Sequence, residues 1–149
     1  MYQRILVPVD GSPTAEQGLD EAIKLARLTG GQLRLLYVVD ELMFVTSIQE
    51  YSAYSADLAR LMKDAGTDIL RKAAERAQAA GAQVDTLLVE SVSGRVSDVI
   101  VEQATQWRAE VIVLGTHGRR GLRRIALGSD AEQVVRAATV PVLLVRGRD

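Results

Sequence analysis

The sequence predicts one doubly wound α/β domain, spanning residues 1–149, in which five parallel strands are arranged in the order 3-2-1-4-5. Two observations support this fold class. Short apolar segments rich in β-branched residues alternate with segments of helical periodicity along the whole chain. In addition, right-handed crossovers between parallel strands place helices on both faces of such a sheet. A chain of 149 residues can fold stably around a single hydrophobic core, so one domain is expected.

Five segments are expected to be strands because they are short, almost continuously apolar and bounded by turn residues. They are residues 4–9, 33–39, 84–89, 111–114 and 141–145. Pro141 has no amide hydrogen, so the fifth strand should lie at an edge of the sheet or begin at an edge position. This order of elements is typical of a Rossmann-like domain.

The segments between these strands have the apolar spacing of helices. Ser12 can cap a first helix that begins at Pro13 and stops at residues 29–31, which read Thr-Gly-Gly. Apolar spacing predicts a second helix over residues 58–80. Two further helices are expected around residues 96–107 and 131–138.

The composition narrows the classes of function. Hydrophobic residues make up 48% and charged residues 25%, which is ordinary for a globular protein. The formal net charge is -1, so the protein has no overall positive charge that would attract nucleic acid or an anionic membrane. We therefore expect neither as a partner. The chain has no cysteine, so disulfides and thiol chemistry are excluded. With no signal layout and no long apolar run, we expect a cytoplasmic protein without a membrane span.

The glycines after the fourth strand form the strongest candidate site, with the spacing Gly115-x-x-Gly118-x9-Gly128-Ser129. Glycine lets the backbone approach a ligand closely, so consecutive amides can bind phosphate oxygens. Gly128 and Ser129 precede the last helix, whose first-turn amides and dipole favour an anion. The other interpretation is that these glycines only form turns. Their position at the end of a parallel strand favours phosphate binding.

A second loop, Asp10-Gly11-Ser12, follows the first strand. If the first and fourth strands are neighbours, both loops open onto one crevice at the carboxyl edge of the sheet. From the residues alone, Asp10 is as well explained as a turn former as it is as a ligand contact. For each arginine in the glycine loop, surface charge is the favoured interpretation: Arg119, Arg120, Arg123 and Arg124.

Other phosphate-site and catalytic motifs are missing. The sequence has no G-x-x-x-x-G-K-[ST] loop and no G-x-G-x-x-G after the first strand. His117 is the only histidine, so no histidine metal cluster is predicted, and a catalytic triad would depend wholly on this residue. Glu90 stands where a response-regulator receiver would have an aspartate. No catalytic residue and no protein metal site are therefore predicted.

The start ILVPVDGS, the glycine-serine spacing and the ending VPVLLVR together resemble the universal stress protein family, over the whole chain. The complete spacing is similar to the ATP-binding branch of that family. The resemblance implies that Pro8 and Val9 line the base pocket, that Asp10 contacts the ribose and that the backbone at Val39 reads the adenine edge. It implies ATP, with Mg²⁺, as the ligand, and a phosphate site formed by Gly115, Thr116, His117, Gly118, Arg119, Gly128 and Ser129.

The resemblance also implies a homodimer that pairs the edges of two fifth strands, formed by Val142, Leu143, Leu144 and Val145. One residue of the site, Asp130, departs from the family pattern, which has a small or apolar residue there. Its carboxylate would repel a phosphate by about 4 kcal/mol at 4 Å and an effective dielectric constant of 20. Alternatively, Asp130 coordinates magnesium or stabilises the helix start, and we favour stabilisation of the helix.

The leading functional hypothesis is a regulatory protein of the stress response that binds ATP without rapid turnover. A slow ATPase or phosphoryl-transfer enzyme, with Ser129 as phosphate acceptor, is the first alternative. A nucleotide-free scaffold dimer is the second. The aromatic segment 40–54 either covers the nucleotide, contacts an unknown protein partner or packs on the second helix.

Overall fold

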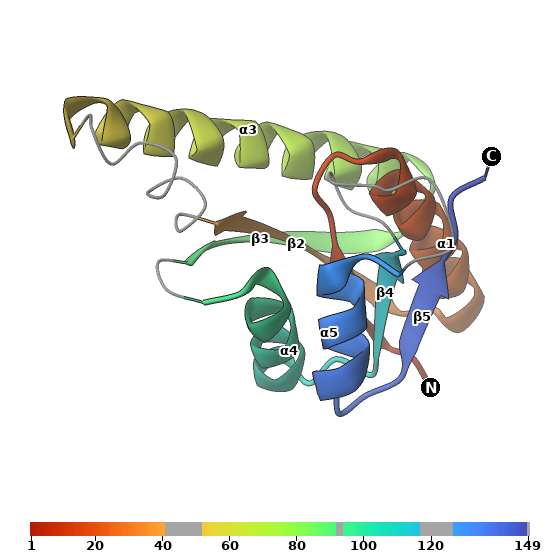
Figure 1. The fold of residues 1–149 in the computed structure, drawn as a ribbon. Coiled ribbons are helices and arrows are strands. Elements are labelled where there is room, and N and C mark those ends of the chain that lie inside the picture. Colours follow the sequence, from red (N-terminus) through yellow and green to blue (C-terminus); the bar gives the residue numbers. More distant parts are fainter. Residues whose placement is uncertain (41–51, 92–93, 117–126, 149) are drawn as a thin grey trace.

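Strands and helices alternate along the chain in the predicted order (Figure 1). The computed structural model describes residues 1–40, 52–91, 94–116 and 127–148. Its elements are β1 (Arg4–Pro8), α1 (Pro13–Thr29), β2 (Gln32–Asp40), α3 (Ser52–Ala79), β3 (Gln83–Ser91), α4 (Val96–Trp107), β4 (Val111–Gly115), α5 (Ser129–Ala137) and β5 (Val142–Val145).

The five strands form one parallel sheet in the order β3-β2-β1-β4-β5, which confirms the predicted topology. β1 lies at the centre, where Ile5 pairs with Leu33 of β2 and with Val111 of β4. β5 lies at one edge, as expected from Pro141, which precedes it. Pro141 still contributes its carbonyl oxygen, which accepts a hydrogen bond from the Ile112 amide at 3.0 Å.

Helices cover both faces of the sheet, so the core has two layers. Strand alternation turns Ile5 and Val7 toward α1 and α3, and turns Leu6 toward α4 and α5. The layer under α1 and α3 includes Leu19, Ala22, Leu35, Val39 and Leu70. The layer under α4 and α5 includes Leu36, Ile100, Ile112, Leu114 and Val134.

The first helix begins and ends as its sequence predicts. The Ser12 hydroxyl accepts a hydrogen bond from the Ala15 amide at 3.2 Å, and Pro13 occupies the first turn. Gly30 ends the helix in the left-handed conformation, with φ of 73°, and its amide donates to the Ala26 carbonyl. These caps fix the direction in which the chain leaves β1.

The helix α3 begins at Ser52, before the predicted start at Leu58. Apolar periodicity marks only the part of a helix that packs on a core, and residues 52–57 contain no glycine or proline that would stop a helix. α3 is long but mostly polar. No helix in the described ranges is long and apolar enough to cross a membrane.

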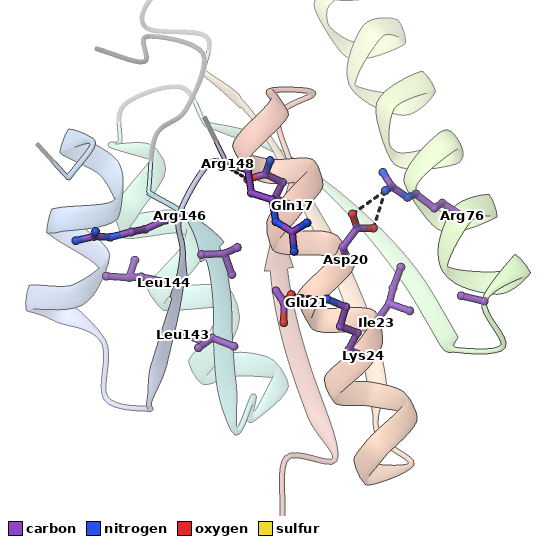
Figure 2. A pocket seen from close by; sticks show the side chains of 12 residues that line it. Gln17, Asp20, Glu21, Ile23, Lys24, Arg76, Leu143, Leu144, Arg146 and Arg148 are labelled. Atoms are coloured by element: carbon purple, nitrogen blue, oxygen red, sulfur yellow. Dashed lines mark hydrogen bonds and ion pairs between the residues drawn. The ribbon is translucent and has the colours of Figure 1, made fainter. Parts of the chain in front are cut away.

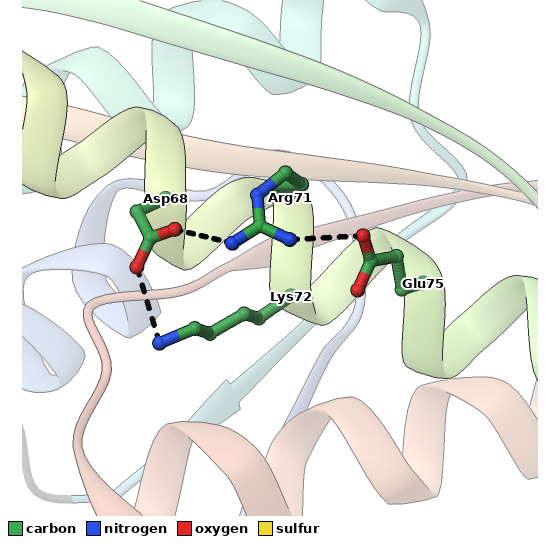
Figure 3. A network of polar contacts seen from close by, with 4 residues as sticks. All are labelled: Asp68, Arg71, Lys72 and Glu75. Carbon is green, nitrogen blue, oxygen red and sulfur yellow. Dashed lines mark hydrogen bonds and ion pairs between the residues drawn. The ribbon is translucent and has the colours of Figure 1, made fainter.

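Ion pairs on the solvent side of α3 follow helical spacing (Figure 3). Arg71 lies 2.6 Å from Asp68 and 3.0 Å from Glu75, and Lys72 lies 3.1 Å from the other Asp68 oxygen. The hydrogen bond from Arg71 lowers the pKa of Asp68, with a further contribution from Lys72. Because the side chains are exposed, these contacts support the helix only weakly.

Candidate functional site

The carboxyl ends of β1 and β4 lie side by side, because Leu6 of β1 pairs with Ile112 of β4. The loops that follow these two strands therefore open at the same edge of the sheet. α1 leaves β1 toward one face, and α5 follows β4 on the other face. This divergence is the switch point at which doubly wound sheets bind ligands, so the predicted neighbour relation between the two strands is confirmed.

Two backbone hydrogen bonds tie the start of α5 to the end of β4. The Gly128 amide donates to the Thr116 carbonyl oxygen at 2.7 Å, and the Thr116 amide donates to the Val145 carbonyl oxygen at 3.0 Å. The two ends of the glycine loop are thus held together at the carboxyl edge. The loop residues predicted to bind phosphate, His117, Gly118 and Arg119, lie outside the described residues, as do Arg120, Arg123 and Arg124.

The first turn of α5 lies at this edge of the sheet and carries two acidic side chains, Asp130 and Glu132. Gly128 is the N-cap residue, and no side chain caps the helix. Because the Gly128 amide is engaged by Thr116, the amides available to a ligand are those that follow it in the first turn. Ser129 is exposed and adds a hydroxyl at this end. Asp130 is also exposed in the first turn, where a carboxylate stabilises the positive end of the helix dipole.

Gly115 is a glycine because α1 passes close to the end of β4. A Cβ atom at this position would lie 2.6 Å from the Thr14 carbonyl oxygen and 3.0 Å from the Ala15 amide nitrogen. Gly18 lies on the other side of the contact, where a Cβ atom would be 3.3 Å from the Gly115 nitrogen. Helix packing therefore explains this glycine independently of phosphate. Gly18 was not identified from the sequence. The feature that could have identified it is a glycine within the helical apolar pattern of residues 13–29.

Asp10 forms the turn between β1 and α1. Its Oδ1 accepts a hydrogen bond from the Ser12 amide at 2.8 Å, and Gly11 adopts a left-handed conformation with φ of 81°. The Val9 amide continues the pairing with β2 by donating to the Leu36 carbonyl oxygen at 2.9 Å. Asp10 therefore forms a turn, as one of its two sequence interpretations predicted. It lies at the carboxyl edge of the sheet, where the ribose contact is predicted.

The predicted base-binding residues lie at the same carboxyl edge, on β1 and β2. Pro8 ends β1 and is half-buried. Val9 and Val39 are buried, with 6% and 2% of each residue exposed, and belong to the core under α1 and α3.

A groove of about 680 Å³ lies elsewhere, between α1, the end of α3 and β5 (Figure 2). It contains an ion pair of 2.6 Å between Asp20 and Arg76, and Leu143, Arg146 and Arg148 are among its other lining residues. None of the predicted nucleotide-site residues lines this groove. Residues of β5 form one of its walls.

The model of the universal stress protein family matches residues 1–146. The chain belongs to the universal stress protein family. A curated relative, the universal stress protein MJ0531 of Methanocaldococcus jannaschii, is 36% identical over 146 residues, which cover 98% of this chain and 83% of the relative.

Solved structures show the same fold in other universal stress proteins. The structure of MJ0577, also from M. jannaschii, has a TM-score of 0.87 at 27% identity and covers 100% of this chain and 99% of its own. A universal stress protein from Archaeoglobus fulgidus, solved in complex with dAMP, has a TM-score of 0.68 at 25% identity. That likeness covers 97% of this chain and 98% of the A. fulgidus chain.

Proposed function

We propose that this universal stress protein binds ATP at the carboxyl ends of β1 and β4 and acts as a nucleotide-dependent regulatory factor in a stress response. Binding, rather than rapid turnover, is its function. The observation that carries the proposal is the uncapped first turn of α5, which the hydrogen bond between Gly128 and Thr116 fixes at the switch point of the sheet.

The phosphates in this proposal are bound by the first-turn amides of α5, by the Ser129 hydroxyl and by the loop that contains Gly118 and Arg119. The α5 terminus suits them because a helix start offers amide donors and a positive dipole end to an anion. Gly128 contributes by fixing the terminus, since its amide already donates to Thr116. Asp130 stabilises the helix and remains outside direct contact with the phosphates.

The nucleoside part in this proposal lies toward β1 and β2. Asp10 contacts the ribose, and the backbone near Pro8 and Val39 contacts the base. The A. fulgidus relative in complex with dAMP supports an adenine nucleotide as the ligand class. In the described residues, no three acidic or histidine side chains gather to hold a metal ion. Magnesium in this proposal is therefore bound mainly by the nucleotide phosphates, as is usual for this ion.

A regulatory protein needs a surface at which it binds a partner. We propose that two copies pair through the edge of β5, because this strand is short and apolar and, among the described strands, has a partner on only one side. Leu143 is 42% exposed there, which is high for a leucine in a strand. The protein partner that responds to the nucleotide state, and the cytoplasmic location, remain predictions.

The direct test is to denature the purified protein and to identify any nucleotide that it releases. We expect an adenine nucleotide in the supernatant or, for protein purified without nucleotide, saturable binding of added ATP. Phosphate release from bound ATP, followed over hours, separates the binding protein from a slow ATPase. We expect phosphate release to equal the buffer blank. Sustained release above that blank would favour the enzyme.

A further inference from the structure

The strand β3 is a long edge strand. It has 9 residues, against about 5–6 in an average strand. All of them pair with β2 in one unbroken register, and among the described strands β3 has no neighbour on its other side. Natural proteins block such edges with charged residues, prolines or bulges. The middle of β3, residues 86–89, reads Thr-Leu-Leu-Val and contains none of these.

A second groove, of about 540 Å³, lies between α3 and this strand. α3 runs over β2 and β3 on one face of the sheet (Figure 1). Its residues in the groove form one helical stripe, with spacings of three and four: Thr67, Leu70, Arg71, Ala74, Glu75 and Gln78. The strand contributes Thr86 and Leu88, which are two residues apart and therefore turn to the same face.

The groove combines an apolar floor with a polar rim. Leu70 is buried, and Leu88 packs on the same core layer, so the floor belongs to the core under α3. At the rim, Arg71 pairs with Glu75 at 3.0 Å, which balances these two charges. The groove therefore suits apolar or hydroxyl side chains and does not require a charged ligand.

An extended peptide matches both the strand edge and the groove. The outward N–H and C=O groups of an edge strand alternate along its length, and a further strand satisfies them by backbone pairing. A strand added beside β3 would turn every second side chain to the α3 face, beside Thr86 and Leu88. Backbone pairing thus supplies attachment, while the groove selects the alternate side chains.

A second copy of this chain matches the β3 edge less well. Two copies are proposed to pair through β5, which lies at the opposite edge of the sheet. If β3 also paired with β3 of a further copy, every chain would have two self-pairing edges, and the sheet would extend from copy to copy without closing. A strand from a different protein ends the sheet after one addition. This step rests on the β5 pairing proposed above.

We propose that β3 and α3 form a docking surface for an extended segment of another protein. The segment adds one strand to the five of the sheet and places apolar or hydroxyl side chains in the groove. This surface is where the partner of the proposed regulatory function binds. Docking needs no nucleotide at the carboxyl ends of β1 and β4.

The test titrates the nucleotide-free protein with a blocked peptide in which valine and threonine alternate between lysine pairs that keep it soluble. Nuclear magnetic resonance and amide hydrogen exchange locate the bound peptide. We expect saturable binding, with shift changes and slower exchange in β3 and in the groove residues of α3. N-methylation of two adjacent central residues of the peptide should abolish binding, because neighbouring amides of a strand point to opposite edges.

A matched pair of variants tests the groove. Thr86→Lys places a charge at an exposed groove position and should weaken peptide binding by about fivefold, the size of one cross-strand contact. Thr105→Lys makes the same change at an exposed position of α4 and should leave binding unchanged. Urea unfolding checks that both variants remain folded.

Several results would overturn the proposal. They are the absence of saturable binding, equal binding of the N-methylated peptide, and shift changes centred on β5. Protection of β3 amides that rises with protein concentration, without peptide, would assign this edge to a second copy and overturn it as well. Because every measurement is made without nucleotide, failure here leaves the proposed ATP site untouched, and failure to bind ATP leaves this docking surface standing.

Discussion

The amide of Gly128 donates to the carbonyl oxygen of Thr116 at 2.7 Å, and this bond joins the start of α5 to the end of β4. This bond gives Gly128 and Ser129 different roles within the glycine-serine motif. Gly128 closes the loop, while the proposed phosphate contacts are the hydroxyl of the exposed Ser129 and the first-turn amides of α5.

Ser129→Ala should weaken ATP binding by about five- to tenfold, because it removes one hydroxyl donor to a charged acceptor. Ser129 is exposed, so the free energy of unfolding should change by less than about 0.5 kcal/mol. Isothermal titration calorimetry and urea unfolding measure the two effects, with Thr67→Ala as the matched exposed hydroxyl. Equal ATP affinity in Ser129→Ala and the wild type would remove Ser129 from the site.

Asp130→Asn should lower the free energy of unfolding by about 0.5 kcal/mol, because an acidic side chain in the first turn of α5 stabilises the helix dipole. ATP affinity should stay the same or rise, since the substitution removes a negative charge near the phosphates. Asp57→Asn, at an exposed position on α3, is the control. A loss of affinity seen only when magnesium is present would instead indicate that Asp130 binds the metal ion.

Gly115→Ala should destabilise the fold by about 1–3 kcal/mol, because its new methyl group would lie 2.6 Å from the Thr14 carbonyl oxygen. Gly18→Ala provides a graded comparison, since its methyl group would be 3.3 Å from the nearest atom and alanine favours the helix. Urea unfolding should therefore rank Gly115→Ala well below Gly18→Ala in stability. The reverse ranking would contradict the packing explanation of Gly115.

Leu143→Lys should shift the protein from dimer to monomer, because it puts a charge on the β5 edge proposed to pair with a second copy. Sedimentation velocity at several concentrations measures the change. Leu28→Lys is the matched control, because Leu28 is 85% exposed on α1 and lies outside that edge. A wild-type chain that stays monomeric at all concentrations would exclude the proposed dimer.

The topology could be predicted because each strand is an apolar run between turn residues and each helix has a clear period. Pro141 also indicated the edge position of β5, which the structure confirms. The start of α3 could not be predicted from periodicity, because apolar helical spacing in the sequence resumes only at Leu58, whereas the helix begins at Ser52.

The candidate site was only partly visible in the sequence. Its glycines and Ser129 are conspicuous, but the sequence does not reveal that the Gly115 position is crowded by Thr14 or that the Gly128 amide is engaged by Thr116.

The central claim is tested most directly by calorimetric titration of the nucleotide-free protein with ATP in the presence of magnesium. We expect saturable binding of one ATP per chain with a Kd below about 1 mM, and clear weakening in Gly118→Ala because its side chain would block the approach of phosphate to the backbone. No saturable heat at millimolar ATP, with no nucleotide released on denaturation, would contradict the nucleotide site at the carboxyl ends of β1 and β4.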